Sequence, residues 1–135
     1  MLMRVLGAVA VLVSAAVHLW LWFEGFRDLS IIGPSFLLNA VAGAAIAVLL
    51  VTWRNWVPGF LTAGFGVCTL GAFVVASTVG LFGLHEHWVG WSVWTAAAAE
   101  GVAIAAGALV LVRDLPASSS RQFQHPPSVP GAHLH

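Results

Sequence analysis

Long uncharged stretches alternate with short polar segments through most of this chain. A helix needs about 20 apolar residues to cross the hydrocarbon layer of a bilayer, and four stretches come close to or exceed that length: 5–23, 29–53, 57–84 and 88–112. The pattern predicts an all-α integral membrane protein. We expect an up-down-up-down bundle of four transmembrane helices at about 4–23, 31–53, 57–83 and 89–112.

The segments between these stretches carry residues that are typical of turns: EGFRDLS, WRNWVPG and HEHWVGW. We expect Ser30 or Ser35 to cap the second helix, with Pro34 in its first turns. The beginning of the chain, MLMR followed by an apolar run and SAAVH, is also similar to a secretory signal peptide. Because the run continues through HLWLWF, we expect a retained helix, with cleavage after Ala16 as the alternative.

The arginines favour one orientation of this bundle, since cytoplasmic loops are enriched in positive charge. Both termini are predicted to lie inside, because this arrangement leaves Arg27 alone on the outer side. Four arginines then lie on the cytoplasmic side: Arg4, Arg54, Arg113 and Arg121. Tryptophans lie near the predicted helix ends, as expected for anchors at the membrane interface: Trp20, Trp22, Trp53, Trp56, Trp88 and Trp91.

Composition supports the membrane location. Of 135 residues, 60% are hydrophobic and 7% are charged, whereas soluble domains carry about 25% charged residues. The net charge is zero, so no nucleic-acid partner is implied. All five basic residues are arginine, which with the abundant Ala, Gly and Val is typical of a high-GC bacterium. We therefore expect a multi-pass protein of a bacterial inner membrane, that is, the cell membrane.

The segment 116–135 differs from the rest because it is polar and rich in Pro and Ser. We interpret it as a disordered cytoplasmic tail that follows a transmembrane domain of residues 1–115. Its histidines, His125, His133 and His135, are interpreted as incidental.

Glu100 is the one acidic residue within an apolar stretch. A charge in the bilayer is costly unless it is paired or neutralised. At a helical rise of 1.5 Å per residue, His18 lies roughly 7 Å, Asn39 roughly 12 Å and Glu100 roughly 13 Å below the outer helix ends. Ser77 and Thr78 fall at a similar depth. We expect Glu100 to be protonated, hydrogen-bonded to Asn39 or a hydroxyl, or paired with protonated His18.

This predicted cluster has two interpretations, and the sequence leaves both open. It can hold the helices in one arrangement, as polar contacts do in membranes. Alternatively, it forms a ligand or proton site, as is the default hypothesis for an ionisable residue in a bilayer. Small residues at helical spacing on each segment, such as Gly59, Gly64, Gly66 and Gly71 on the third, are interpreted as helix-packing positions.

Two outer loops carry most of the remaining charged and imidazole side chains. They are predicted to form the mouth of such a site: Glu24, Arg27, Asp28, His85, Glu86 and His87. The HEH sequence suggests zinc or copper bound by His85 and His87, a lesser hypothesis because the ligand set is incomplete. We do not expect haem, since His18 is buried and His85 lies at the surface.

The sequence contains no nucleophile triad, phosphate-binding loop or CxxC pair. The leading prediction is therefore a non-enzymatic protein without a cofactor, an accessory or stabilising component of a membrane complex. Its partners would be the lipid bilayer and either another membrane protein or a second copy of itself. One alternative is a small-molecule or proton-coupled binding or transport protein that uses the His/Asn/Glu cluster from the outer side. A second alternative is a metal-binding membrane protein that uses the HEH loop.

Overall fold

The computed structural model describes residues 1–83, 85–87 and 89–116 of the chain. Within this part the protein is all-helical, with four long helices, a short 3-10 helix and no strand. The helices are α1 (Leu2–Phe23), η1 (Phe26–Asp28), α2 (Ile32–Thr52), α3 (Trp56–Thr78) and α4 (Trp91–Asp114). Each of the four α-helices is long and apolar enough to cross a membrane, so the predicted fold class is confirmed.

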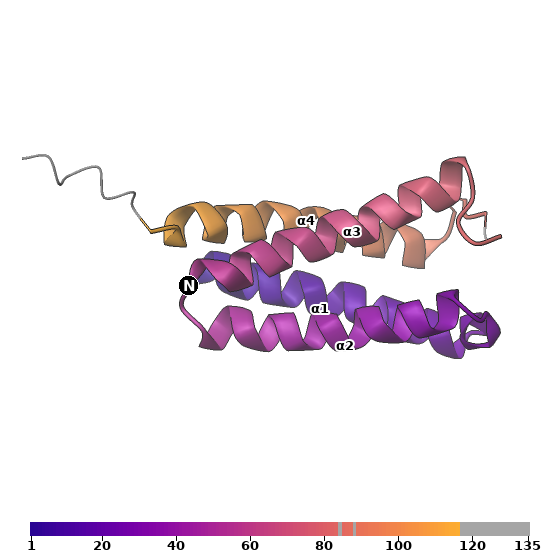
Figure 1. Cartoon of the computed structure of the whole chain (residues 1–135), viewed down its shortest axis with the longest axis horizontal. Coiled ribbons are helices and arrows are strands. Elements are labelled where there is room, and N and C mark those ends of the chain that lie inside the picture. Colours follow the sequence, from indigo (N-terminus) through magenta and orange to yellow (C-terminus); the bar gives the residue numbers. More distant parts are fainter. Residues whose placement is uncertain (84, 88, 117–135) are drawn as a thin grey trace, which may run out of the picture.

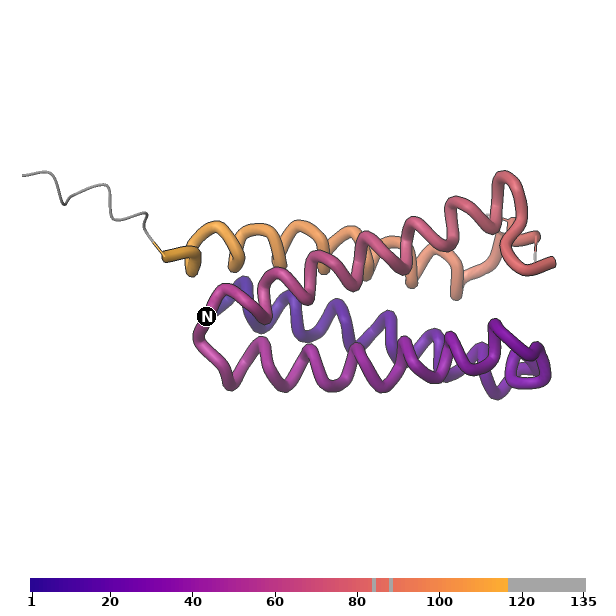
Figure 2. Tube along the Cα trace, in the orientation of Figure 1, coloured from indigo at the N-terminus to yellow at the C-terminus, as the bar shows by residue number. Residues whose placement is uncertain are grey.

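The four helices run in alternating directions and form two antiparallel pairs, α1 with α2 and α3 with α4 (Figure 1). Helix α1 also packs along α4, which joins the two pairs. Helices α2 and α3 lie close together near the short connection at residues 53–55 and diverge toward the other end (Figure 2). This divergence gives the bundle one tight end and one wide end. The wide end carries residues 24–31, 79–83, 85–87, 89 and 90, and we predicted it to be the outer one.

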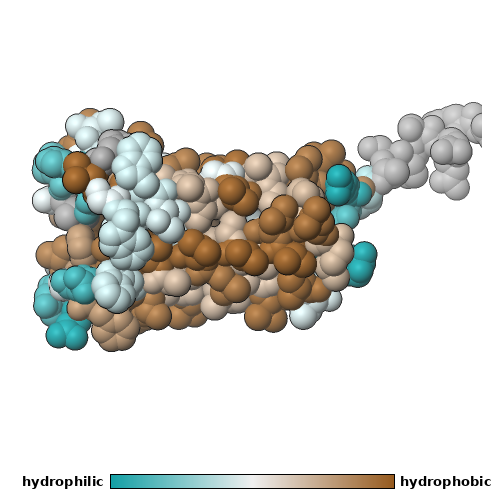
Figure 3. Space-filling model, turned by 180° about the vertical axis from the view of Figure 1, so that it is seen from behind, coloured by the Kyte–Doolittle hydropathy of each residue, from teal (hydrophilic) through white to brown (hydrophobic). Residues whose placement is uncertain are grey.

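Small side chains fill the interior of the bundle. Its core consists of Ala8, Ala10, Val11, Ile46, Ala47, Leu50, Ala103 and Val110. Large apolar side chains lie mostly outside, where the middle of the molecule is apolar and the hydrophilic residues gather at its two ends (Figure 3). Small residues inside and large apolar residues outside are expected of a bundle in lipid, because helices associate there by close packing and not by removing apolar surface from water.

Glycines allow α3 and α4 to approach each other backbone to backbone. A Cβ on Gly66 would come within 2.7 Å of the Glu100 carbonyl oxygen, and one on Gly107 within 2.5 Å of the Ala63 nitrogen. Two other glycines of α3 do not have this role, since nothing lies within 4 Å of a Cβ on Gly64 or Gly71. The glycines of α3 therefore serve close packing only on the face that meets α4, where Gly66 lies, and not at Gly64 and Gly71.

Helix α3 ends at Thr78, earlier than the predicted end at 83. The chain turns here because Gly80 and Gly83 adopt φ values of +83° and +82°, in the left-handed region that terminates helices. The predicted caps of α2 also differ: Ile31 is the N-cap and has no side-chain cap bond, while Ser35 donates to the Ile31 carbonyl oxygen at 2.7 Å. The predicted tail, with its three histidines, lies almost wholly outside the described residues.

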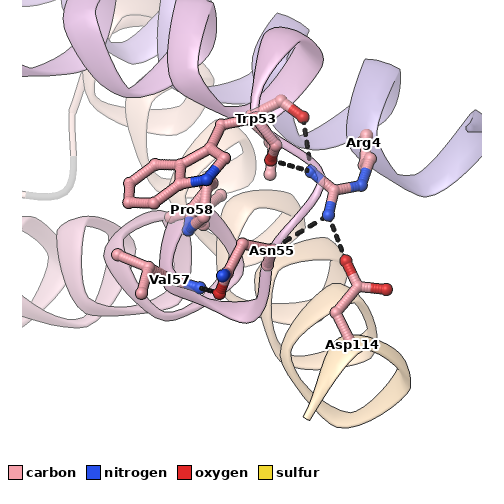
Figure 4. Close-up of polar contacts among 8 residues, drawn as sticks. Arg4, Trp53, Asn55, Val57, Pro58 and Asp114 are labelled. Atoms are coloured by element: carbon pink, nitrogen blue, oxygen red, sulfur yellow. Dashed lines mark hydrogen bonds and ion pairs between the residues drawn. The ribbon is translucent and has the colours of Figure 1, made fainter. Parts of the chain in front are cut away.

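Arg4 fastens the tight end of the bundle (Figure 4). Its side chain is buried, with the residue 5% exposed. The guanidinium donates to the carbonyl oxygens of Leu50, Trp53 and Asn55 at 2.7, 3.0 and 3.0 Å. It also forms an ion pair with Asp114, at the end of α4. Arg4, interpreted from the sequence as a topological signal, is thus also a clamp that joins α1 to the α2–α3 connection and to α4.

Candidate functional site

Glu100 lies where α4 meets α1, and the residue is 2% exposed. Its partner is Ser14 of α1, whose hydroxyl donates to Glu100 Oε1 at 3.2 Å. The close approach of α3 at Gly66 covers the backbone of Glu100 from a second side. The sequence left open whether Glu100 is protonated, hydrogen-bonded to Asn39 or a hydroxyl, or paired with His18. In the structure its carboxyl accepts a hydrogen bond from a hydroxyl, that of Ser14.

His18 lies one turn beyond Ser14 on the same helix face, as the spacing of four residues requires. Its Nδ1 lies 2.8 Å from the Ser14 carbonyl oxygen and 3.5 Å from the Ser14 hydroxyl. Because a carbonyl oxygen can only accept, Nδ1 is the donor in this contact and carries a proton. Phe36 packs edge-on against the imidazole at a centroid distance of 5.0 Å.

Asn39 pairs with α3, on the other side of the bundle. Its amide Nδ2 donates to Thr69 Oγ1 at 3.0 Å, and the Thr69 hydroxyl donates to the Phe65 carbonyl oxygen at 2.8 Å. The Thr69 oxygen therefore acts as an acceptor, which fixes the orientation of the amide. Asn39 Oδ1 is buried and has no hydrogen-bond partner within the described part of the chain.

His18, Asn39 and Glu100 border one cavity of about 650 Å³ at the wide end of the bundle. Its walls come from all four helices, η1 and the connection between α3 and α4. Apolar side chains dominate the walls, among them Phe26, Phe36, Phe65, Phe73, Ala96 and Val93. The cavity also reaches residues on the outer surface of α2 and α3, since Leu38 is 68% exposed and Cys68 is exposed. It is thus bordered both by the buried Glu100 and by exposed side chains of α2 and α3.

The structure brings only part of the predicted cluster together. Ser77 and Thr78 do not line the cavity. Their hydroxyls donate to the Val74 carbonyl oxygen of their own helix at 3.0 and 2.7 Å. Asn39 lines the same cavity as Glu100 but bonds to Thr69 instead. Ser77 and Thr78 are therefore not part of the cavity wall.

Of the predicted mouth residues, Glu86 alone borders the cavity. Glu24, Arg27 and Asp28 are exposed, with Arg27 Nε 3.8 Å from Asp28 Oδ1. Burial raises the pKa of Glu86 above its ordinary value of 4.5, although the neighbouring His87 and its backbone hydrogen bond work in the opposite direction. Glu86 therefore places a second carboxyl at the rim of the cavity.

The predicted metal ligands His85 and His87 are both exposed. The His85 ring packs against Gly80, where a Cβ would lie 2.6 Å from its Cε1. Across residues 1–116, apart from 84 and 88, no group of three or more His, Cys, Asp or Glu side chains is placed to hold a metal ion. The HEH segment therefore supplies no ligand set in this part of the chain.

Sequence reasoning missed two members of the site. Ser14 was not among the predicted site residues, although its spacing of four residues from His18 puts both on one helix face. Cys68, the one cysteine of the chain, was not among them either, but it is exposed and borders the cavity.

Comparison with protein-family models, curated proteins and solved structures finds no match for this chain. Fold and geometry alone define its class. It is a four-helix protein suited to a membrane, with an apolar cavity that leads to a buried carboxyl.

Proposed function

We propose that this chain is a multi-pass protein of the cell membrane that binds a small, mostly apolar molecule in the cavity between α2 and α3. The observation that carries the proposal is a cavity of about 650 Å³ that borders Glu100, a residue only 2% exposed. Volumes of a few hundred to a thousand cubic ångströms, apolar walls and a few convergent polar groups are typical of small-molecule sites.

A purely structural cluster would form a closed contact in which the polar groups satisfy one another. Here Glu100 and Asn39 both border the cavity, yet they bond to Ser14 and Thr69. Asn39 Oδ1 keeps no partner, although a buried polar atom without a hydrogen bond is costly. This arrangement favours binding over a role confined to holding the helices together.

The lipid is the proposed source of the bound molecule. Leu38 of α2 and Cys68 of α3 border the cavity and are exposed on the surface that lipid would cover. At the opposite end, the Arg4 clamp ties three helices together. Because the cavity is confined to the wide end, binding is better supported than passage across the membrane. The predicted accessory role is supported only by the missing catalytic and phosphate-binding motifs. The binding role is supported by the cavity itself.

The test is photolabelling in liposomes with dodecane that carries a diazirine, followed by mass spectrometry of the labelled residues. Ala96 lines the cavity one turn from Glu100, while Ala98 is exposed and lies outside it. We expect labels on the cavity face of α2 and α3 in the wild-type chain, and their loss in Ala96→Phe. Ala98→Phe, the matched control, keeps them. Labels spread evenly around the helices, or unchanged in Ala96→Phe, would overturn the proposal.

A further inference from the structure

We propose that the molecule bound in this cavity carries a protonated amino group on an apolar body, as a long-chain alkylammonium ion does. This inference rests on the proposed binding function and adds the chemical class of the ligand. It follows from which hydrogen-bonding groups of the cavity wall are already occupied and which remain open.

The hydroxyl donors of the wall are mostly engaged with backbone carbonyl groups. Ser35 donates to the Ile31 carbonyl oxygen at 2.7 Å and Thr69 donates to that of Phe65 at 2.8 Å. One amide hydrogen of Asn39 is engaged by Thr69. The donors that remain are the second amide hydrogen of Asn39 and the hydroxyl of Ser92, which also lines the cavity.

Acceptors, in contrast, remain open on several sides of the cavity. Acceptor sites remain on the two carboxyls that border the cavity, Glu100 and Glu86, while Asn39 Oδ1 lacks a partner among the described residues but is itself buried. Glu100 receives a single hydrogen bond, from Ser14, whereas a carboxylate has about four acceptor sites. A ligand that donates hydrogen bonds complements this wall, and one that only accepts them does not.

The charges of the wall favour a cation. Among the described residues, two carboxyls, Glu100 and Glu86, border the cavity, and no arginine does. Arg27 is exposed beside Asp28, and Arg4 is engaged at the other end of the bundle. Aromatic rings add to this preference, because Phe26, Phe36 and Phe65 line the cavity and ring faces attract ammonium groups.

An ammonium group with N–H donors fits better than a quaternary one. Hydrogen bonds between an ionised donor and a carboxylate are about twice as strong as neutral ones, and a quaternary nitrogen forms none. The apolar walls accommodate the hydrocarbon body, which is the part of such a molecule that prefers the bilayer. The opening beside Leu38 and Cys68 lets this body arrive from the lipid.

The test measures how well three amphiphiles displace the diazirine-bearing dodecane from the cavity of the full-length chain in liposomes at neutral pH. Dodecylammonium, dodecyltrimethylammonium and dodecanoate share one chain length and differ in charge and N–H donors. We expect dodecylammonium to displace the probe at a concentration at least about tenfold lower than either of the others, as one charge-assisted hydrogen bond implies. In Glu100→Gln this advantage falls to about twofold or less, while Glu24→Gln, which changes an exposed carboxyl outside the cavity, preserves it.

The outcomes separate this inference from the function on which it rests. Equal displacement by all three amphiphiles, or an amine advantage that persists in Glu100→Gln, overturns the amine proposal and leaves cavity binding intact. Absence of cavity labelling by the dodecane probe overturns the binding function itself, and the ligand class with it. Circular dichroism of each variant in the same liposomes shows whether the helices are retained.

Discussion

Ser14 and Glu100 form a hydrogen bond of 3.2 Å between α1 and α4, across 86 positions of the sequence. Because both residues are buried, this bond sets how the two helices face each other at the edge of the cavity. Glu100 is at the same time part of the cavity wall.

Replacement of Ser14 by Ala should lower the free energy of unfolding by about 1 kcal/mol, the usual worth of a hydrogen bond between membrane helices. The measurement is an SDS titration of the chain in mixed micelles, followed by circular dichroism. Ser77→Ala is the control, since that hydroxyl bonds within its own helix. Equal losses in the two variants would mean that the bond to Glu100 adds nothing to stability.

Loss of the Arg4 clamp should have a larger effect. Arg4→Ala removes bonds to three carbonyl groups and leaves Asp114 without its cation. The ion pair is half-buried, since the Asp114 side chain is 32% exposed, so its loss costs less than the roughly 3 kcal/mol of a fully buried pair. With the carbonyl bonds also lost, we expect a total loss of about 2–3 kcal/mol in the same titration. Arg113→Ala, at an exposed position on α4, should change stability by less than about 0.5 kcal/mol. A comparable loss there would rule out a specific clamp.

Gly66 and Gly64 give a matched test of the α3–α4 contact. A Cβ on Gly66 meets the Glu100 carbonyl oxygen at 2.7 Å, while one on Gly64 meets nothing within 4 Å. Gly66→Ala should therefore cost about 1–3 kcal/mol through overpacking, and Gly64→Ala should be neutral or stabilise by up to about 1 kcal/mol through helix propensity. Thermal unfolding in micelles distinguishes the two, and a stable Gly66→Ala variant would contradict the close approach.

Glu86 should make stability depend on pH in an identifiable direction. Its pKa is raised in the folded chain from an ordinary value of 4.5, so the folded state binds more protons than the unfolded state between the two pKa values. Stability should therefore be greatest below pH 4.5 and fall as the pH rises through this window. Glu86→Gln should flatten the stability profile there, as unfolding curves over a pH series would show. An unchanged slope would place the titrating group elsewhere.

The fold was predictable from the sequence because hydrocarbon thickness fixes helix length. Four apolar stretches of suitable length were enough to place α1 to α4. The end of α3 was misplaced because apolar residues continue past Thr78, while the left-handed conformations of Gly80 and Gly83 turn the chain. A hydropathy pattern shows that the apolar stretch continues past Thr78, but it does not show that the chain turns within that stretch.

The site was harder to predict, because depth along a helix does not tell which way a side chain points. His18, Asn39 and Glu100 all line one cavity. Ser77 and Thr78 have a similar depth, but their hydroxyls bond back to their own helix. Asn39 pairs with Thr69 across α2 and α3, and no local pattern in the sequence encodes which hydroxyl of α3 the amide meets.

Helices α2 and α3 diverge from the short connection of residues 53–55, beside Arg4. This connection is therefore the pivot of the angle between the two helices. A small rotation about this pivot moves the far tips of α2 and α3 much more than the residues near it. A change in this angle would therefore alter the width of the cavity more than the contacts of Arg4. A substitution near the connection is thus a way to alter the proposed binding site without changing a residue that lines it.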